Sequence, residues 1–239
     1  MEIVLERKIK QGVTIIEGFP GIGLVGTIAT EFLIEHLKAK PIGMIKGSEI
    51  PPMVAVHQGK LVRPLGLFYA EKENILILHV ISGIPGSEWE IAEILKEQAK
   101  KLKAAEIVSL ESVTVPTVGA FSAQPQGFYF TNNEDSAKLM RKIGLDSLKE
   151  GIVVGVTGAL MLSSDTPLTC IFAETHSKLP DSKAAAKIIE ILNKYLGLKI
   201  DTAPLIRSAE QFEEKIKTIL EKSKQAQELQ EKKGLGYMG

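Results

Sequence analysis

The chain has 239 residues, enough for one large α/β domain or two small ones, and its 44% hydrophobic content allows a sizeable core. Lysine plus arginine and aspartate plus glutamate each number 29, so the formal net charge is zero. This balance argues against a nucleic-acid-binding protein, which needs surplus cations to face phosphates.

The first part of the chain alternates apolar runs with amphipathic segments. Residues 13–19, VTIIEGF, are rich in β-branched residues and are followed by proline and glycine, which is typical of a buried strand. Leu24, Ile28 and Phe32 then recur at helical spacing, and Ser87 is a candidate N-cap for a later helix. The predicted elements are a strand at 13–19, a helix at 23–40, strands at 40–47, within 53–70 and at 74–82, and a helix at 86–104.

The second part continues the alternation. The predicted elements are a strand at 106–115, a short helix at 133–144, a buried strand at 151–162, a strand at 168–176 and a helix at 181–197. Asp181 or Ser182 would cap the last helix, and Gly197 would end it. Alternating strands and helices, with several strands apolar on both faces, predict an α/β fold whose sheet is covered on each side. We expect one core domain over residues 1–206.

Residues 207–239 have a different character. Phe212, Ile216 and Ile219 share one helix face, and the segment then becomes progressively less apolar. It ends in the uncharged stretch GLGYMG at 234–239. We therefore expect an extended C-terminal helix followed by a flexible tip.

The stretch GFPGIGLVG at residues 18–26 raises the main functional question. Gly21, Gly23 and Gly26 fit the dinucleotide fingerprint G-x-G-x-x-G, in which glycines let a pyrophosphate approach a helix N-terminus. In the competing interpretation the glycines only turn a strand into a helix: Gly23 and Gly26 would let the two backbones approach, and Gly18 or Gly21 would take a positive φ. Pro20 removes an N–H near the phosphate position, which favours the structural turn.

The sequence gives little support for a metal site, a disulfide or acid/base catalysis. The four histidines (His36, His57, His79 and His176) show no metal-binding spacing, and the single Cys170 supports neither a zinc site nor a disulfide. An acid/base cluster of Asp165, Glu174 and His176 is conceivable, but no nucleophile elbow accompanies it. The expectation is a protein without catalytic residues, cofactor or metal.

The location of the protein is also suggested by the sequence. The first ten residues are interrupted by charge and do not resemble a signal peptide. No run approaches the roughly 20 apolar residues of a membrane helix. A single cysteine suits a reducing compartment. We expect a soluble, cytoplasmic protein with neither a nucleic-acid nor a membrane partner.

Four motifs in series carry a family resemblance: GFPGIGLVG with the later IPPMVAVHQGKLVRP, then ISGIPGSEWEIAEIL, VVGVTGALML and PDSKAAAKIIEILNKYLGLKIDTAPL. Together they resemble the archaeal branch of the proteasome assembly chaperone family, from about residue 5 to residue 220. The resemblance implies a three-layer α/β/α sandwich similar to purine nucleoside phosphorylases, without a catalytic site. It also implies a homo-oligomer that engages the α-subunits of the 20S proteasome, to assist assembly or to activate or adapt the mature particle.

The resemblance assigns roles to particular residues. Proteasome activators end in a hydrophobic residue, a tyrosine and any residue, whereas this chain ends in Tyr237, Met238 and Gly239, so the match is shifted by one position. Leu235 and these three residues are the expected proteasome-binding tip. Gly18, Pro20, Gly21, Gly23 and Gly26 form the expected structural turn. The sequence itself suggests the oligomer contacts: Val54 and Val56 lie near prolines typical of an edge strand, and Phe212, Ile216 and Ile219 share an apolar helix face. The alternative is a nucleotide- or nucleoside-binding enzyme that uses the Gly21–Gly26 loop.

Overall fold

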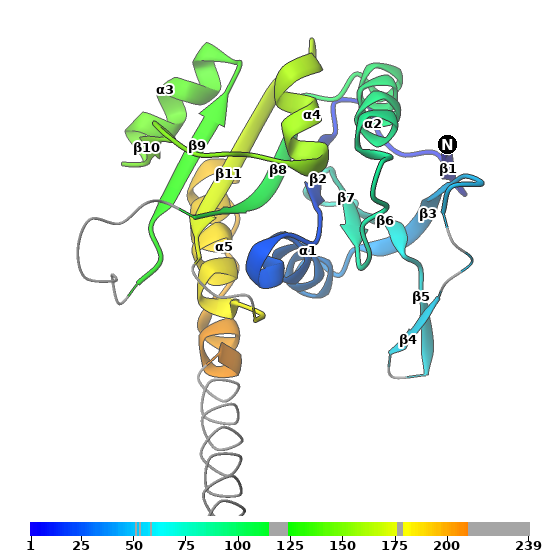
Figure 1. The fold of residues 1–239 in the computed structure, drawn as a ribbon, viewed down its shortest axis with the longest axis horizontal. Helices are drawn as coiled ribbons and strands as arrows, with labels where there is room; N and C mark the ends of the chain where they lie inside the picture. Colours follow the sequence, from blue (N-terminus) through cyan, green and yellow to red (C-terminus); the bar gives the residue numbers. More distant parts are fainter. Residues whose placement is uncertain (51, 53, 58, 115–123, 176–178, 210–239) are drawn as a thin grey trace, which may run out of the picture. The chain divides into compact units, whose positions relative to one another are not determined.

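A mixed β-sheet runs through the core of the chain, with helices on both of its faces (Figure 1). The computed structural model describes residues 1–50, 52, 54–57, 59–114, 124–175 and 179–209. Its strands are β1 (Glu2–Leu5), β2 (Thr14–Gly18), β3 (Lys40–Lys46), β4 (Ala55–His57), β5 (Lys60–Val62), β6 (Leu65–Ala70), β7 (Ile75–Val80), β8 (Glu106–Val113), β9 (Gly127–Thr131), β10 (Asp146–Ser147) and β11 (Leu168–Glu174). Its helices are η1 (Ile22–Leu24), α1 (Val25–His36), α2 (Glu88–Leu102), α3 (Glu134–Lys142), α4 (Gly155–Ser163) and α5 (Ser182–Leu196).

Within the described residues, nine strands form the main sheet, in the order β1-β3-β6-β7-β2-β8-β11-β9-β10. The central strands β7, β2, β8 and β11 are parallel, whereas β1, β3 and β6 join one side by antiparallel pairing and β9 joins the other side antiparallel to β11. Every residue of β7 and β11 is buried. These strands have no polar face because helices cover both sides of a parallel block.

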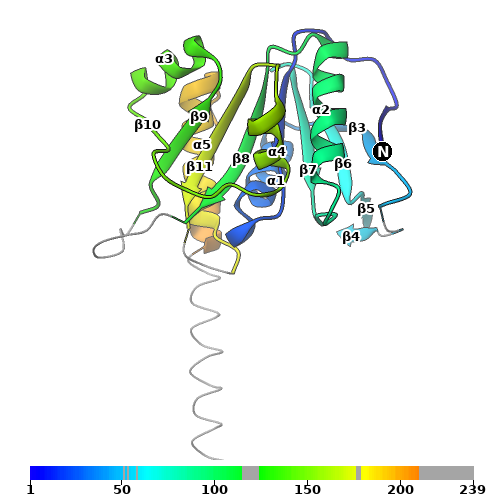
Figure 2. The same ribbon diagram turned by 45° about the horizontal axis from the view of Figure 1, so that its top comes forward.

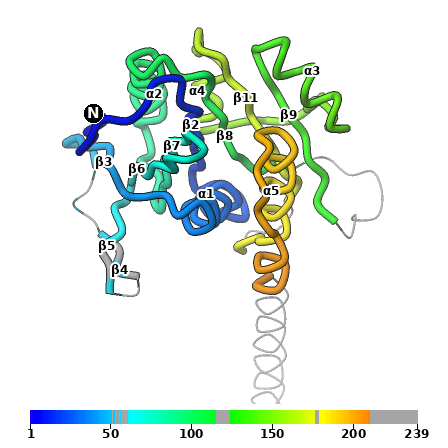
Figure 3. The backbone as a smooth tube through the Cα atoms, turned by 180° about the vertical axis from the view of Figure 1, so that it is seen from behind, coloured from blue at the N-terminus to red at the C-terminus, as the bar shows by residue number. Residues whose placement is uncertain are grey.

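The two helical layers follow from the alternation of side chains along β2. Gly18 lies against Gly26 and Thr30 of α1, so α1 covers the face to which Gly18 belongs. Glu17 points to the opposite face, and its sheet neighbour Ser109 shares a hydrogen bond with Thr157 of α4. Figure 2 shows α2 and α4 together on one face, and Figure 3 shows α1 and α5 on the other. The predicted α/β fold is thus confirmed, and the likeness to purine nucleoside phosphorylases stays a prediction.

Helix ends agree with the sequence at several points. The Asp181 side chain accepts a hydrogen bond from the Ala184 backbone N–H, and Gly197 takes the left-handed conformation that ends α5. Asn133 caps α3 in the same way through the backbone N–H groups of Asp135 and Ser136. Ser87 stands at the N-cap of α2 but makes no side-chain capping bond, so its predicted role as a hydrogen-bonding cap is wrong.

One predicted strand is wrong, and others are missing from the prediction. Residues 151–154 form a connection in which Ile152 and Val154 are exposed, and α4 begins at Gly155. An apolar run of this length fits a buried helix as well as a strand. Strands β1, β9 and β10 were not anticipated; β1 and β9 are short and only partly buried.

Backbone contacts divide the chain into two compact units, Met1–Ile200 and Asp201–Gly239. In the second unit residues 203–209 are helical, and the Ala203 N–H donates to Asp201 Oδ1. Leu235, Tyr237, Met238, Gly239, Phe212, Ile216 and Ile219 lie outside the described residues. The predicted division into 1–206 and 207–239 therefore stays a prediction. None of the described helices combines the length and apolar character needed to cross a bilayer.

Candidate functional site

The glycine loop joins β2 to α1 at the centre of the sheet. A β carbon on Gly18 would clash with the backbone carbonyl of Gly26, and one on Gly26 would clash with the carbonyl of Leu110 in β8. The two glycines therefore let α1 approach β2 and β8 at backbone distance. The prediction that Gly18 or Gly21 takes a positive φ is wrong: Gly23 does, with φ of 68°, followed by Leu24 with φ of 51°.

A second set of contacts fixes the other side of this loop. The backbone N–H of Asp181 donates to the Gly23 carbonyl at 2.8 Å, while the Asp181 side chain caps α5 and accepts a hydrogen bond from Thr175 Oγ1 at 2.7 Å. A β carbon on Gly23 would stand 3.1 Å from both Asp181 and Thr175. The loop is thus clamped between β8 and the start of α5.

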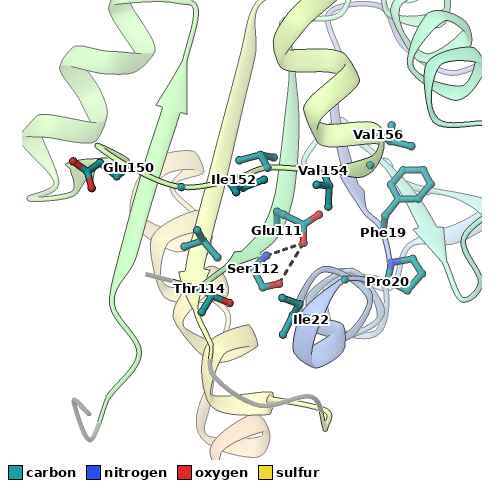
Figure 4. Close-up of a pocket in the computed structure, with 15 residues that line it drawn as sticks. Phe19, Pro20, Ile22, Glu111, Ser112, Thr114, Glu150, Ile152, Val154 and Val156 are labelled. Carbon is teal, nitrogen blue, oxygen red and sulfur yellow. Dashed lines mark hydrogen bonds between the residues drawn. The ribbon is translucent and has the colours of Figure 1, made fainter. Parts of the chain in front are cut away.

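A carboxyl group lies against the loop from the side of β8. Glu111 Oε1 accepts a hydrogen bond from the Ser112 backbone N–H at 2.9 Å, and it stands 2.5 Å from the position of a β carbon on Gly21 (Figure 4). Desolvation raises the pKa of Glu111 to about 7, while hydrogen bonds from Ser112 act in the opposite direction. In a dinucleotide-binding protein the backbone of such a loop faces the phosphates. Here it faces an acid of the protein itself.

A cavity of about 610 Å³ opens at the carboxyl ends of β2 and β8 (Figure 4). In the sheet order, the strand after β2 (β3) and the strand after β8 (β9) lie on opposite sides of this pair. Ligands of open α/β folds bind where the strand order diverges in this way. Its lining residues are Phe19, Pro20, Gly21, Ile22, Glu111, Ser112, Val113, Thr114, Glu150, Gly151, Ile152, Val153, Val154, Gly155 and Val156. The charged residues in this set are Glu111 and Glu150, and it contains no lysine, arginine or histidine.

Glu17 is a second acid on the cavity side of the sheet. It is fully buried, and neither of its carboxyl oxygens makes a hydrogen bond of normal geometry with the described residues. The nearby Ser109 hydroxyl is engaged with Thr157 Oγ1 at 2.7 Å. Burial raises the pKa of Glu17 to about 8, against a smaller lowering effect of Ser109, and the charge of Glu111 raises it further.

The histidines and other candidate groups do not assemble into a reaction centre. Buried His79 shares a 2.9 Å hydrogen bond with Thr30 Oγ1, and burial lowers its pKa to about 4. Asp165 precedes β11 and pairs with Lys100 at 2.7 Å, whereas Glu174 stands at the other end of that strand. His176 lies outside the described residues. The described residues contain no group of three side chains suited to a metal ion.

Val54 and Val56 lie apart from this site. Val56 belongs to β4, which pairs with β5 in a separate hairpin, and its cross-strand neighbour is Leu61. Val56 is 68% exposed and Leu61 is 74% exposed. The sequence interpretation did not identify Leu61, Glu17 or Glu111. The only available signal was an acid inside the apolar run at 13–19.

The comparisons with known proteins agree with this arrangement of a glycine turn and helices on both faces of the sheet. Residues 15–220 match the model of the PAC2 family, and the chain belongs to this family. It is similar over 98% of both chains to the crystal structure of Pyrococcus furiosus PbaA, described as an archaeal homolog of proteasome-assembly chaperone, with 30% identity and a TM-score of 0.85. The predicted family resemblance is thereby confirmed.

Two further similarities are more distant. Pyrococcus furiosus PbaB, described as an archaeal proteasome activator, shares the fold, with 23% identity, a TM-score of 0.76 and coverage of 91% of this chain and 97% of its own. The uncharacterized protein MJ0106 of Methanocaldococcus jannaschii is 28% identical over 92% of this chain and 91% of its own length. The chain therefore has archaeal relatives along nearly its whole length.

Proposed function

We propose that this chain is a non-enzymatic, cytoplasmic interaction protein that forms a homo-oligomer and docks its C-terminal tip on the α-subunits of the 20S proteasome. The observation that carries the proposal is the similarity to PbaA over 98% of both chains, together with the PAC2 match over residues 15–220. Because function resides in particular surfaces and not in the fold as such, the proposal is supported below by the glycine loop, the exposed hairpin and the C-terminal tip.

The chemistry of the glycine loop supports a role without nucleotide. Glu111 stands against Gly21, and the described residues that line the cavity beside them include two acids and no cation. A phosphate would meet like charge there and find no partner to neutralise it. This arrangement disfavours nucleotide binding in the alternative of a nucleotide- or nucleoside-binding enzyme, whereas the nucleoside part of that alternative is tested by experiment. Calorimetry with NAD, ATP and nucleosides is expected to detect no binding.

An exposed apolar surface supports the oligomer. Val54, Val56 and Leu61 are all exposed, and Val56 faces Leu61 across the β4–β5 hairpin. Side chains of this kind gain free energy when a second protein surface removes them from water. We assign this hairpin to a contact between copies of the chain.

The C-terminal tip is the proposed proteasome contact. Tyr237 supplies an aromatic ring, Met238 an adaptable thioether and Gly239 a terminal carboxylate. One such tip buries little surface, but several tips on one oligomer bind with avidity because each later contact is intramolecular.

Capture by 20S proteasome tests the proposal. The full-length chain is compared with a chain that ends at Lys233 and with a full-length Gln230→Ala control, after light scattering has shown equal oligomer mass. We expect the truncated chain to lose capture and the control to keep it. Free α-subunits and the mature particle are used as separate targets, because an assembly chaperone favours the former and an activator the latter. Equal capture of all three proteins would remove the tip from the mechanism.

A further inference from the structure

The cavity at the carboxyl ends of β2 and β8 has the dimensions of a small-molecule site. Its volume of about 610 Å³ lies inside the range of roughly 300–1,000 Å³ that is usual for such sites. Ile22, Ile152 and Val154 line the cavity. All three are large apolar side chains that are exposed to solvent, Ile152 to 89% and Val154 to 72%. An apolar body placed among them would release water from these side chains.

The polar groups of the cavity select the charge of a ligand. Glu111 lines the cavity together with Ser112 and Gly21, and the exposed Glu150 is the other acid in the lining (Figure 4). Because the described lining residues include no cation, they favour neither a carboxylate nor a phosphate as the ligand. A ligand that carries positive charge would supply the partner that Glu111 lacks.

The buried Glu17 lies on the same face of the sheet as Glu111, although it is not one of the residues that line the cavity. Glu17 pairs in the sheet with Ser109, which lies two residues before Glu111 on the same strand, so all three side chains leave the same face of the sheet. Glu17 is fully buried, and no described residue donates a hydrogen bond of normal geometry to its carboxyl oxygens. Two acids therefore share a region of low polarity, and no described lysine, arginine or histidine is paired with either of them.

The lining also distinguishes an organic cation from a metal ion. Hard metal ions require several oxygen ligands, and the described residues offer no group of three acidic, histidine or cysteine side chains. Most of the cavity wall consists instead of valine, isoleucine, proline and phenylalanine side chains. We propose that the cavity binds a small organic cation, a primary ammonium group on a compact apolar body, with the ammonium on the Glu111 carboxylate and the body between Ile22, Ile152 and Val154. This inference goes beyond the proposed proteasome role and does not depend on it.

Binding of this kind is linked to protons. Because desolvation raises the pKa of Glu111 to about 7, part of this group is protonated at neutral pH. An ammonium ion favours the ionised form, so its affinity rises as the pH increases from 6 to 8. The titratable groups on the surrounding elements are Glu17 on β2, Glu106 on β8, Cys170 and Glu174 on β11, Lys149 and Glu150 in the connection before α4 and Asp181 at the start of α5, whereas η1 and α4 contribute none.

Benzylammonium is the probe for this site, with benzyl alcohol as its neutral analogue and benzoate as the anion. Calorimetry and NMR titration of the full chain are expected to show benzylammonium binding, with benzyl alcohol and benzoate at least about tenfold weaker. The isosteric Glu111→Gln variant is expected to lose about tenfold in affinity. Glu71→Gln is the matched control, because this exposed carboxylate lies in the turn between β6 and β7 and is not one of the lining residues, and the affinity of this variant is expected to stay within about twofold of the wild type.

A second variant tests the apolar part of the proposed binding site without changing Glu111. Ile152→Ser changes a side chain that is 89% exposed, so the fold should persist, and its affinity for benzylammonium is expected to fall several-fold. Thermal unfolding of each variant verifies that lost binding is not lost structure. The proposal is overturned if the wild-type chain does not bind benzylammonium below about 10 mM. It is also overturned if benzyl alcohol binds equally well, or if neither Glu111→Gln nor Ile152→Ser weakens binding.

Discussion

Glu111 stands so close to Gly21 that a β carbon on residue 21 would be 2.5 Å from Glu111 Oε1. The contact joins the end of β8 to the loop that begins α1, two segments that the sequence separates widely. A glycine pattern that attracts phosphates in dinucleotide-binding proteins is here used to admit the carboxyl group of the same chain. Because each glycine of this loop contacts different atoms, single substitutions can test the role of each one.

The loss of stability on replacing a glycine of this loop by alanine should depend on the atom that the new methyl group meets. Gly18→Ala places it against the backbone of Gly26, which cannot move without shifting α1, so we expect a loss of about 3 kcal/mol in the free energy of unfolding. Gly21→Ala meets only the end of the Glu111 side chain, and a loss nearer 1 kcal/mol is expected. Gly83→Ala, with nothing closer than 3.9 Å, is the control. Urea unfolding measures all three, and a loss for Gly21→Ala as large as that for Gly18→Ala would contradict the ranking.

The buried Glu17 should make the protein less stable as the pH rises. Its pKa of about 8 in the folded state exceeds the ordinary value of 4.5, so between these values the folded state binds more protons than the unfolded state. The free energy of unfolding then falls with increasing pH, with a slope approaching ~1.4 kcal/mol per pH unit for this one group. Glu17→Gln removes that slope.

The comparison is made by urea unfolding of the wild type and Glu17→Gln between pH 5.5 and 7.5. Glu111, whose pKa is raised to about 7, contributes a slope of the same sign to both proteins and largely cancels in their difference. The advantage of Glu17→Gln over the wild type should grow steadily across this range. Parallel curves would mean that Glu17 is not buried as described.

The β4–β5 hairpin should control the oligomer. Introducing a charge by Val56→Asp or Leu61→Asp places a carboxylate on the proposed contact, and we expect a lower particle mass by light scattering. Lys72→Asp changes an exposed residue in the turn between β6 and β7 and should leave the mass unaltered. If all three variants keep the wild-type mass, the copies meet through another surface.

The order of the last residues should set the strength of proteasome docking. Exchanging Tyr237 and Met238, by Tyr237→Met together with Met238→Tyr, leaves the composition unchanged and places tyrosine in the penultimate position of the activator pattern. We expect several-fold greater stimulation of fluorogenic peptide hydrolysis by the 20S proteasome, since a rigid aromatic anchor replaces a flexible side chain. Identical stimulation by both sequences would show that the shift by one position has no consequence.

The sequence predicted the layered fold well because its strongest patterns are local. The amphipathic α2 and α5, the buried β7 and β11 and the cap Asp181 each depend on residues close together in the chain. The run at 151–162 was misassigned because its valines and leucines fit either a strand or a buried helix, and only packing against α2 decides between them.

The candidate site was much less accessible to sequence analysis. Glu17, Glu111 and Ile152 belong to β2, β8 and the connection before α4, and no short motif links them. The glycine pattern located the correct loop but could not reveal which group faces it. A loop that lies against a carboxyl group and a loop that lies against a phosphate both need a residue without a β carbon at this position, here residue 21.

The strand order also limits how copies of this protein can associate. The two outermost strands of the sheet are β1, with four residues, and β10, with two. Such short edge strands offer few free backbone N–H and C=O groups to an incoming strand, so polymerisation into fibres by extension of this sheet is disfavoured. Side-chain surfaces are left as the means of association, and these favour closed assemblies of finite size.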